Sequence, residues 1–296
     1  MAILANVSKG VIKQKPITFI YGAGGLGKDT FAAGYPKPLT VDVEKGTGHL
    51  NIDRLLPGTH QEIFDAVKEM AESKHDYKTL NVSGMDTWEG LAWKYIMAKD
   101  GVDTMAKAGG GYGGGYKVYI QLCQELAAML KVCQGRGMYV NLIGHEMVQP
   151  YNDPTLQTYD RYRIKMYEGP KESAAKFWFD FCDIVLFVKK KVYQKSDNRA
   201  IDEGKHYIYT QGRAAFDAKS RYALPFEMEL NAEKFLAALE KGPESAEAVY
   251  KLCNELAALV KDKNLQKKVY ERIEKEKGNA NELSSTLEVI KGLEKE

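Results

Sequence analysis

A short glycine-rich segment near the N-terminus has the residue types and spacing of a phosphate-binding loop. Residues 22–28 read GAGGLGK, which fits the pattern G-x-x-x-x-G-K. The glycines let the backbone turn its amide groups toward phosphate oxygens, and Lys28 can neutralise the β- and γ-phosphates. The segment therefore predicts a nucleotide site formed by Gly22, Ala23, Gly24, Gly25, Leu26, Gly27, Lys28, Asp29 and Thr30.

Two positions depart from the usual metal-binding pattern of such a loop. After the lysine the pattern has Ser or Thr, whose hydroxyl binds magnesium, and here the residue is Asp29. The apolar strand that should end in Asp reads LNVSGMD over residues 80–86, and Ser83 stands where Asp is expected. We hypothesise that the two ligands have been exchanged, which keeps one hydroxyl and one carboxylate near the metal. The alternatives are a decayed site that hydrolyses nucleotide poorly, and a carboxylate supplied by Asp86 in a shifted register.

These side chains need a sheet with crossover helices to position them. The run ITFIY at residues 17–21 predicts a strand, the glycine loop follows it, and a helix begins at Lys28. Further strands are expected at residues 39–43, 79–82 and 138–143, and helices at residues 61–73, 87–98 and 118–133. Strands that alternate with helices predict an α/β fold with a mostly parallel central sheet.

The second half of the chain has a different pattern. Residues 148–170 are polar and rich in Tyr and Arg, and we expect a long loop there. Residues 184–191 and 206–210 predict a late β-hairpin with a charged turn around residues 196–204. From residue 243 onward, Lys, Glu, Leu and Ala at helical spacing predict a C-terminal helical extension. We therefore expect a core of residues 1–240 and an extension of residues 243–296.

The segment YGAGGLGKDTFAAGYPKPLTVDVEKGTGHLNIDRL resembles the start of phage-encoded RecA-like recombination ATPases, which are associated with single-strand annealing. They belong to a broad group of phage P-loop nucleotide-binding proteins. Further similar segments, within residues 17–230, are YKTLNVSGMDTWEGL, GGGYGGGY, NLIGHEM, FCDIVLFV and AKSRYALPFEMEL. The resemblance implies a RecA-like core, ATP and magnesium as cofactors, assembly into homo-oligomeric rings or filaments, and single-stranded DNA as partner.

The resemblance also implies roles for three residues outside the loop. Glu44 in VDVE matches the glutamate that polarises the attacking water, although a solvated loop acid is the alternative. His145 in IGHE follows a core strand where relatives place a sensor of the γ-phosphate; a merely hydrogen-bonded structural histidine is the alternative. Arg221 in SRYALP is the candidate for a cation that reaches the γ-phosphate of a neighbouring subunit, with a surface salt bridge as the alternative.

Two segments combine aromatic rings with positive charge, as single-stranded DNA binding requires. A stacked base contributes about 1–3 kcal/mol, and nearby cations contact phosphates. The basic residues of the second segment, residues 151–167, cluster without matching acids. The alternative is that the tyrosines pack under their loops while the charges face water. The candidates are Tyr112, Tyr116 and Lys117 in a flexible glycine loop, and Tyr159, Arg161, Tyr162, Arg163 and Lys165.

The composition argues against several other classes of protein. The net charge of +2 gives no evidence of a general polyanion binder. The four cysteines form no CxxC pair, which argues against a zinc site of usual spacing and a disulfide framework, and indicates small buried thiols. No apolar run is long enough to span a bilayer and no signal peptide is evident. We therefore expect a cytoplasmic protein without a membrane partner, located in the host cytoplasm if it is phage-encoded.

Two other functions remain open from the sequence. GKDT also resembles the phosphate loop of certain nucleoside monophosphate kinases, and the arginines of residues 161–165 could form the lid of such an enzyme. A second alternative is a non-hydrolysing module in which nucleotide only gates assembly or DNA binding, and the irregular metal positions favour it. The C-terminal helices could contact a single-strand-binding protein or pack on a neighbouring subunit.

Overall fold

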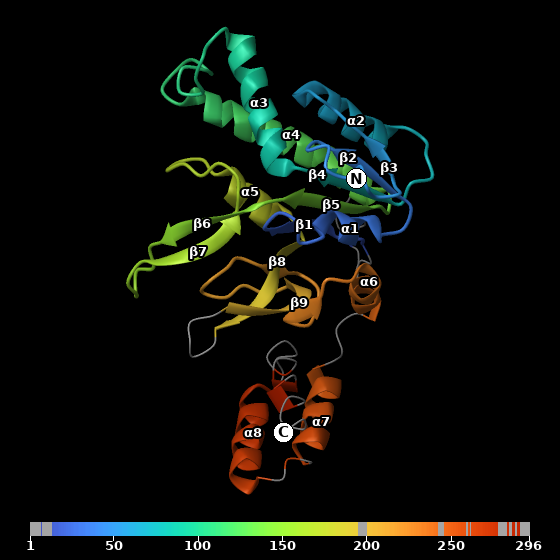
Figure 1. The fold of residues 1–296 in the computed structure, drawn as a ribbon, viewed down its shortest axis with the longest axis vertical. Helices are drawn as coiled ribbons and strands as arrows, with labels where there is room; N and C mark the ends of the chain where they lie inside the picture. Colours follow the sequence, from blue (N-terminus) through green and yellow to red (C-terminus); the bar gives the residue numbers. More distant parts are fainter. Residues whose placement is uncertain are drawn as a thin grey trace.

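Strand β1 (Ile17–Gly22) lies inside a mostly parallel sheet of nine strands (Figure 1). The order across the sheet is β11-β9-β8-β1-β5-β4-β2-β3, and β10 pairs with β8. All six residues of β1 are buried, as expected for a parallel strand covered on both faces. The computed structural model describes Val7 and residues 14–194, 200–241, 246–258, 260, 262–277, 283, 286, 287, 289 and 290.

The strands and helices alternate through the first half of the chain. The strands parallel to the β1 direction are β2 (Pro38–Asp42), β3 (Asp53–Leu55), β4 (Thr79–Ser83), β5 (Tyr139–Gly144) and β8 (Ile184–Gln194). The antiparallel strands are β9 (Ala200–Tyr209), β10 (Lys219–Ser220) and β11 (Glu227–Glu229). The core helices are α1 (Lys28–Ala33), α2 (His60–Glu72), α3 (Met85–Asp100), α4 (Gly114–Gly135), α5 (Ala174–Phe181) and α6 (Ala232–Lys241).

Helices cover both faces of the sheet because alternate residues of each strand point to opposite sides. Phe19 and Tyr21 pack in the larger hydrophobic cluster, with α2, α3, α4 and α5. Ile20 packs in the second cluster, with Phe31 of α1 and Phe235 of α6. The predicted class is confirmed: an α/β core with a mostly parallel sheet, a late β8–β9 hairpin and C-terminal helices. Part of the expected turn, residues 195–199, lies outside the described residues.

The expected loop at residues 148–170 is wrong for its first part. Strands β6 (Glu146–Tyr151) and β7 (Tyr159–Ile164) form a separate two-stranded antiparallel sheet that extends away from the main one (Figure 1). Strand β7 carries two Tyr and two Arg, and β6 ends in Pro150 and Tyr151. Half-buried polar residues of this kind hide the alternation on which strand prediction depends. Helix α5 then follows in a segment for which the sequence analysis predicted no helix or strand.

The glycine-rich segment before α4, which was expected to be a flexible loop, is closely packed against its own backbone. A Cβ on Gly109 would lie 2.4 Å from the carbonyl carbon of Gly114, and one on Gly115 would lie 2.4 Å from the oxygen of Met105. Close backbone approach, rather than mobility, therefore requires glycine at these positions. Helix α4 already begins at Gly114, so that Cys123 and Cys133 both lie inside it and are buried.

The C-terminal helices α7 (Ala246–Ala257) and α8 (Lys263–Lys275) pack on each other around a third hydrophobic cluster. Cys253, Ala257, Val269 and Ile273 are among its buried residues. In Figure 1 these helices lie beyond α6, away from the main sheet. The boundary between residues 240 and 243 stays a prediction, since the cluster shows local packing only.

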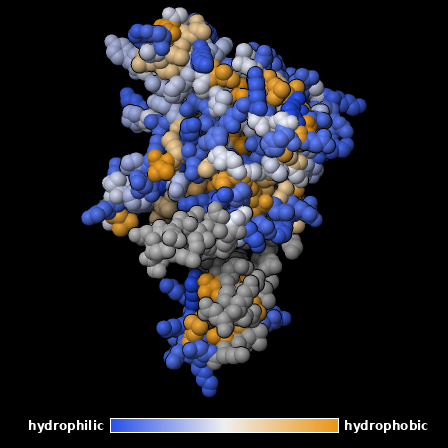
Figure 2. Space-filling model, in the orientation of Figure 1, coloured by the Kyte–Doolittle hydropathy of each residue, from blue (hydrophilic) through white to orange (hydrophobic). Residues whose placement is uncertain are grey.

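None of the described helices is both long and apolar enough to cross a membrane. On the face drawn in Figure 2, hydrophobic residues lie scattered among hydrophilic ones. Isolated exposed apolar residues of this kind are normal for folded domains.

Candidate nucleotide-binding site

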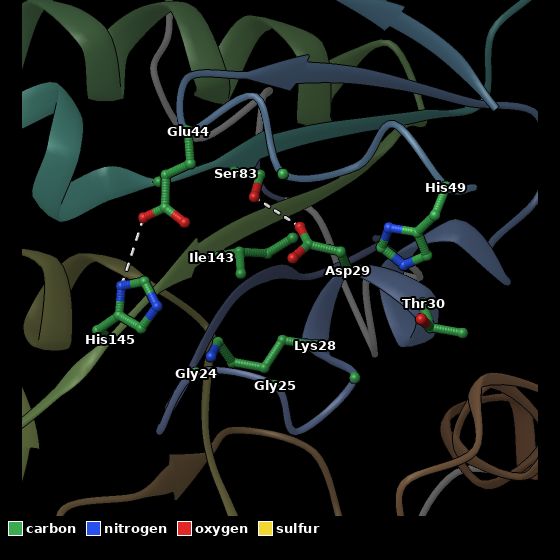
Figure 3. A pocket seen from close by; sticks show the side chains of 14 residues that line it. Gly24, Gly25, Lys28, Asp29, Thr30, Glu44, His49, Ser83, Ile143 and His145 are labelled. Carbon is green, nitrogen blue, oxygen red and sulfur yellow. Dashed lines mark hydrogen bonds and ion pairs between the residues drawn. The ribbon is translucent and has the colours of Figure 1, made fainter. Parts of the chain in front are cut away.

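The carboxyl ends of four parallel strands meet at one edge of the sheet. Tyr21 pairs with Gly144, Ser83 pairs with Ile143, and Asp42 pairs with Ser83, so the loops that follow β1, β5, β4 and β2 begin side by side. These loops enclose a cleft of about 350 Å³ (Figure 3). It is lined by Gly24, Gly25, Gly27, Lys28, Asp29, Thr30, Glu44, Gly46, His49, Ser83, Gly84, Ile143, Gly144 and His145.

Lys28 occupies the position expected of the phosphate-binding lysine. It begins α1 directly after Gly27, whose φ of 84° lies in the left-handed region that favours glycine. Its ammonium donates hydrogen bonds to the carbonyls of Gly22 (3.0 Å) and Ala23 (2.7 Å). Burial lowers the pKa of Lys28, and the carboxylates of Asp29 and Glu44 oppose this change. A buried cation at a helix N-terminus is suited to an anionic ligand.

The two unusual metal positions face each other. Ser83 Oγ donates a hydrogen bond of 2.6 Å to Asp29 Oδ1, although 54 residues separate them in the chain (Figure 3). Ser83 is buried at the end of β4, and Asp29 lies in the first turn of α1. The structure thus brings together the hydroxyl and the carboxylate that the sequence analysis predicted to share one site.

Glu44 reaches the cleft from the loop after β2. Its Oε1 accepts a hydrogen bond of 3.1 Å from Thr87 Oγ1 at the start of α3. Gly84 makes room for it, since a Cβ on Gly84 would lie 2.6 Å from Glu44 Cγ, and its φ of 92° also favours glycine. The carboxylate is therefore held at the mouth of the cleft, where it can accept a proton from a water molecule.

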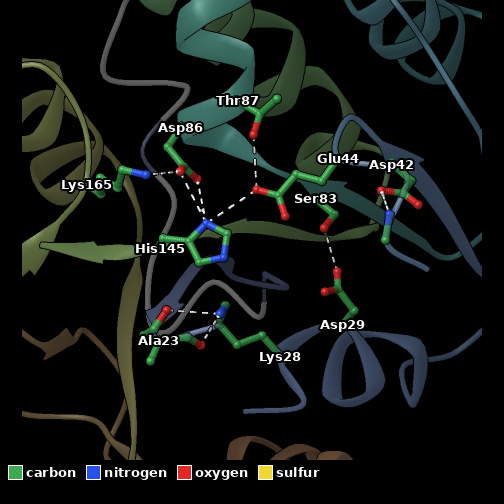
Figure 4. Close-up of polar contacts among 12 residues, drawn as sticks. Ala23, Lys28, Asp29, Asp42, Glu44, Ser83, Asp86, Thr87, His145 and Lys165 are labelled. Atoms are coloured by element: carbon green, nitrogen blue, oxygen red, sulfur yellow. Dashed lines mark hydrogen bonds and ion pairs between the residues drawn. The ribbon is translucent and has the colours of Figure 1, made fainter. Parts of the chain in front are cut away.

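His145 connects Glu44 with Asp86 (Figure 4). Its Nδ1 lies 3.2 Å from both oxygens of Asp86 and 3.3 Å from Glu44 Oε1. Its Nε2 is on the side of the phosphate loop, 3.9 Å from where a Cβ on Gly24 would lie. Asp86 also forms an ion pair of 3.3 Å with Lys165. The three groups Glu44, Asp86 and His145 place their ligand atoms within 4.8 Å of one another, a spacing that could also hold a metal ion.

Three residues near the cleft were missed by the sequence analysis. Asp42 is buried and accepts hydrogen bonds from the Thr47 N–H (2.9 Å) and hydroxyl (2.7 Å), which shapes the loop that carries Glu44. His49 lines the cleft from the same loop. Glu146 accepts a hydrogen bond from the backbone N–H of Ala23, and burial raises the pKa of its carboxyl group. Their proximity in sequence to Glu44 and His145 was the available signal.

A second hollow of about 570 Å³ adjoins the cleft, and Gly27 and Thr30 line both. Its walls are the side of α1, the middle of β9 around Lys205, and the turn between β11 and α6. Leu26, Phe31 and Leu230 give it an apolar part, and His206 and Asn231 line it with polar groups. An apolar wall with a few polar groups is typical of small-molecule sites.

The predicted DNA-contacting residues of the glycine segment have different environments. Tyr112 is fully exposed and has a φ of 53°, an unfavourable backbone conformation for a non-glycine residue. Lys117 is exposed on α4. Tyr116 instead stacks on Tyr167, with ring centroids 4.3 Å apart, and packs against Trp93. Tyr112 and Lys117 are accessible to a ligand, whereas packing occupies Tyr116.

The premise that the basic residues of residues 151–167 have no matching acids is wrong. Arg161 pairs with Asp217 at 2.7 Å, and Arg163 pairs with Asp217 at 3.1 Å and Glu168 at 2.6 Å. Asp217 lies more than 50 residues further along the chain, so the local sequence of the segment does not indicate this partner. Lys165 is paired with Asp86.

Rings and cations nevertheless gather on the β6–β7 hairpin. The Arg161 guanidinium lies 5.0 Å above the ring of Tyr151, whose centroid is 5.5 Å from that of Tyr159. Tyr162 lies nearer the core, 5.3 Å from Phe187, and Lys189 covers its ring. The outer group of Tyr151, Tyr159 and Arg161 has the composition of a stacking surface.

Arg221 lies at the other end of the sheet from the cleft of its own chain. Its Nη1 pairs with Asp183 at 2.8 Å, and Asp183 also accepts from the backbone N–H of Ile17, where β1 begins. Gln134 donates to the same carboxylate over 2.7 Å. The contacts within one chain are those of a structural ion pair, and the role toward a neighbouring subunit stays a prediction.

The phosphate loop, the buried lysine and the parallel sheet define a P-loop NTPase. The family described as an AAA domain matches residues 14–222, and the chain belongs to this family. Among solved structures, the crystal structure of the RadB recombinase is similar, with a TM-score of 0.39 and 13% identity over 67% of this chain and 82% of that chain. No curated protein matches the sequence significantly.

Proposed function

We propose that this protein binds ATP with magnesium, hydrolyses it, and acts on single-stranded DNA as a RecA-like homo-oligomer in phage recombination or annealing. The observation that carries the nucleotide part is the buried Lys28 ammonium inside a glycine loop, with Glu44 and His145 on the facing loops. Lys28 and the loop amides would hold the phosphates, and Glu44 would position the attacking water. His145 would contact the γ-phosphate side through Nε2.

The second hollow supports a nucleotide rather than a simple phosphate ligand. Because Gly27 and Thr30 line both spaces, the two lie side by side, and a ligand with its phosphates in the cleft would place its nucleoside beside α1. Leu26 and Leu230 offer apolar surface to a base, and His206 and Asn231 offer polar atoms.

The proposal of DNA binding rests on two groups of rings and cations. Arg161 of the first group is 18% exposed and would reach a phosphate only after leaving Asp217. Tyr151, Tyr159 and Arg161 form one group on the β6–β7 hairpin, and exposed Tyr112 and Lys117 form another near α4. The hairpin begins directly after His145, so a strand bound there would contact a segment that is attached to the nucleotide cleft. Arg221 would serve a neighbouring subunit only after leaving Asp183.

The non-hydrolysing module is the second candidate function. It is favoured by the Ser83–Asp29 hydrogen bond, which shows that the metal side of the cleft differs from the usual hydroxyl and aspartate arrangement. The kinase alternative lacks comparable support, since Arg161 and Arg163 are ion-paired with Asp217 and Glu168.

The test is magnesium-dependent ATP hydrolysis with and without single-stranded DNA. We expect turnover that DNA increases, that Lys28→Ala abolishes, and that the matched control Lys251→Ala on exposed α7 leaves unchanged. ATP binding without turnover would favour the non-hydrolysing module. If the wild-type protein does not bind ATP, the proposal is wrong.

A further inference from the structure

The hydrogen-bonded pair of Asp29 and Ser83 occupies the two positions that usually bind the metal in a P-loop site. In a usual P-loop site, a Ser or Thr hydroxyl follows the lysine and an Asp ends the facing strand. Here each position carries the type of group expected at the other, and the two are hydrogen bonded at 2.6 Å. The pair therefore retains one hydroxyl, one carboxylate and a single negative charge.

The electrostatics of the contact explain why the two changes belong together. An Asp at position 83 opposite Asp29 would put two carboxylates within contact distance in a largely buried place, where like charges repel strongly. A Ser at position 29 opposite Ser83 would leave two hydroxyls and no charge. Either single change disturbs the site, whereas the exchange keeps its composition.

We propose that Asp29 and Ser83 together form the metal-binding side of the nucleotide site, with the carboxylate on α1 and the hydroxyl on β4. Magnesium prefers oxygen ligands and usually takes one or two carboxylates together with phosphate oxygens. Both side chains line the cleft beside Lys28, so the donor set fits this cation. This inference rests on the proposed binding of ATP, and magnesium would neutralise phosphate charge there.

Asp86, the other candidate carboxylate, is already engaged. Its side chain is 9% exposed and contacts His145 at 3.2 Å and Lys165 at 3.3 Å. Two cationic or hydrogen-bonding partners compete with a metal ion for its oxygens. Asp29, by contrast, accepts from a neutral hydroxyl that can itself serve as a ligand.

The experiment is a double-mutant cycle on ATP binding, measured in EDTA and with increasing magnesium. The readout is the factor by which magnesium strengthens ATP binding, which does not require turnover. We expect a factor of at least about ten in the wild type, loss of most of it in Asp29→Ser and in Ser83→Asp, and recovery to within about threefold in the double variant. Manganese bound with ATP, followed by electron paramagnetic resonance, gives an independent readout of the ligands.

Several outcomes would overturn the exchange. The first is a double variant in which magnesium strengthens ATP binding no more than in the worse single variant. The second is a wild type whose ATP affinity does not change with magnesium. The third is loss of the magnesium effect in Asp86→Asn but not in Asp29→Asn. Asp29→Asn and Ser83→Ala remove the ligands without adding a buried charge, and thermal melting shows whether each variant folds. Absence of ATP binding even in EDTA would instead refute the proposed function, and the exchange with it.

Discussion

The backbone N–H of Lys165 donates a hydrogen bond of 3.0 Å to the carbonyl of His145, and both side chains contact Asp86. The two residues flank the β6–β7 hairpin, so this contact closes the base of the hairpin beside the nucleotide cleft. Any displacement of His145 by a ligand in the cleft must also change the contacts at the base of the hairpin. A coupling between two sites requires such a shared element.

The first prediction concerns the base of the β6–β7 hairpin. Lys165→Ala removes the ion pair with Asp86 but no residue that lines the cleft. We expect ATP affinity and DNA-independent turnover to stay within about twofold of wild type, while stimulation of turnover by single-stranded DNA falls at least about threefold. The measurement is steady-state hydrolysis over a range of DNA concentrations.

Two further variants show whether the effect follows the positive charge of Lys165. Lys165→Arg keeps the positive charge and should retain most of the stimulation. Lys176→Ala removes an exposed lysine of α5 and should behave as wild type. Full stimulation in Lys165→Ala would contradict the coupling through Asp86.

A second prediction separates hydrolysis from nucleotide binding. Gly84→Ala places a Cβ 2.6 Å from Glu44 Cγ and strains a backbone with φ of 92°, so Glu44 must move. We expect turnover to fall by about 10²-fold or more, in line with loss of general-base catalysis, while ATP affinity changes little. Equilibrium ATP binding and single-turnover hydrolysis measure the two effects.

Gly90→Ala, inside the helix that begins directly after Gly84, is the matched control. A Cβ there meets no atom within 4 Å, and alanine stabilises a helix interior by about 0.5–1 kcal/mol relative to glycine. This variant should keep its turnover and melt at a slightly higher temperature. Equal loss of activity in both variants would show that the position of Glu44 is not responsible.

The third prediction tests the second hollow as the place of the nucleoside. Leu230→Ala removes an apolar side chain beside Gly27, while the phosphate cleft keeps all its residues. We expect ATP affinity to fall by about 5- to 20-fold, the effect of about 1–2 kcal/mol of lost apolar contact. Binding of inorganic tripolyphosphate should be unchanged, and titration calorimetry with both ligands makes the comparison. Equal weakening of both ligands would contradict this assignment.

Local patterns predicted the strand, the glycine loop and the helix around Lys28. The glycine loop, Lys28 and the strand before it are adjacent in the chain, so their chemistry and geometry can be read together. The facing of Asp29 and Ser83 also followed, because the ends of parallel strands and the loop after β1 meet at one edge of the sheet. A motif of adjacent residues with a known backbone geometry can be recognised directly from the sequence.

The environment of the basic residues could not be predicted in the same way. Arg161 and Arg163 find Asp217 through the tertiary fold, and no local pattern indicates which acid will lie opposite them. Tyr116 was expected at a surface but stacks on Tyr167, which comes from a segment 51 residues further along. The ion pairs and the exposure of a side chain depend on contacts with residues distant in the chain, and these contacts are known only from the structure.

The last prediction is a pH dependence of stability that comes from His60. This residue is buried between α2 and α3, where Trp88 Nε1 donates a hydrogen bond of 3.2 Å to its Nδ1. Burial lowers the pKa of His60 from 6.5 to about 4, and protonation at Nδ1 would break the bond from Trp88. The unfolded chain therefore binds a proton more readily than the folded one between these two values, and stability is lost as the pH falls through this window.

At pH 5 the expected loss of unfolding free energy relative to pH 7.5 is about 2 kcal/mol from this one residue. Urea unfolding at the two pH values measures it. His60→Leu, which cannot be protonated, should show a smaller difference between the two pH values even if leaving the Trp88 donor without a partner lowers its stability at both. His49→Leu is the matched control, because His49 is exposed and should leave the wild-type difference intact. If the wild type and His60→Leu lose the same free energy on acidification, other groups cause the pH dependence, and burial of a neutral His60 does not contribute to it.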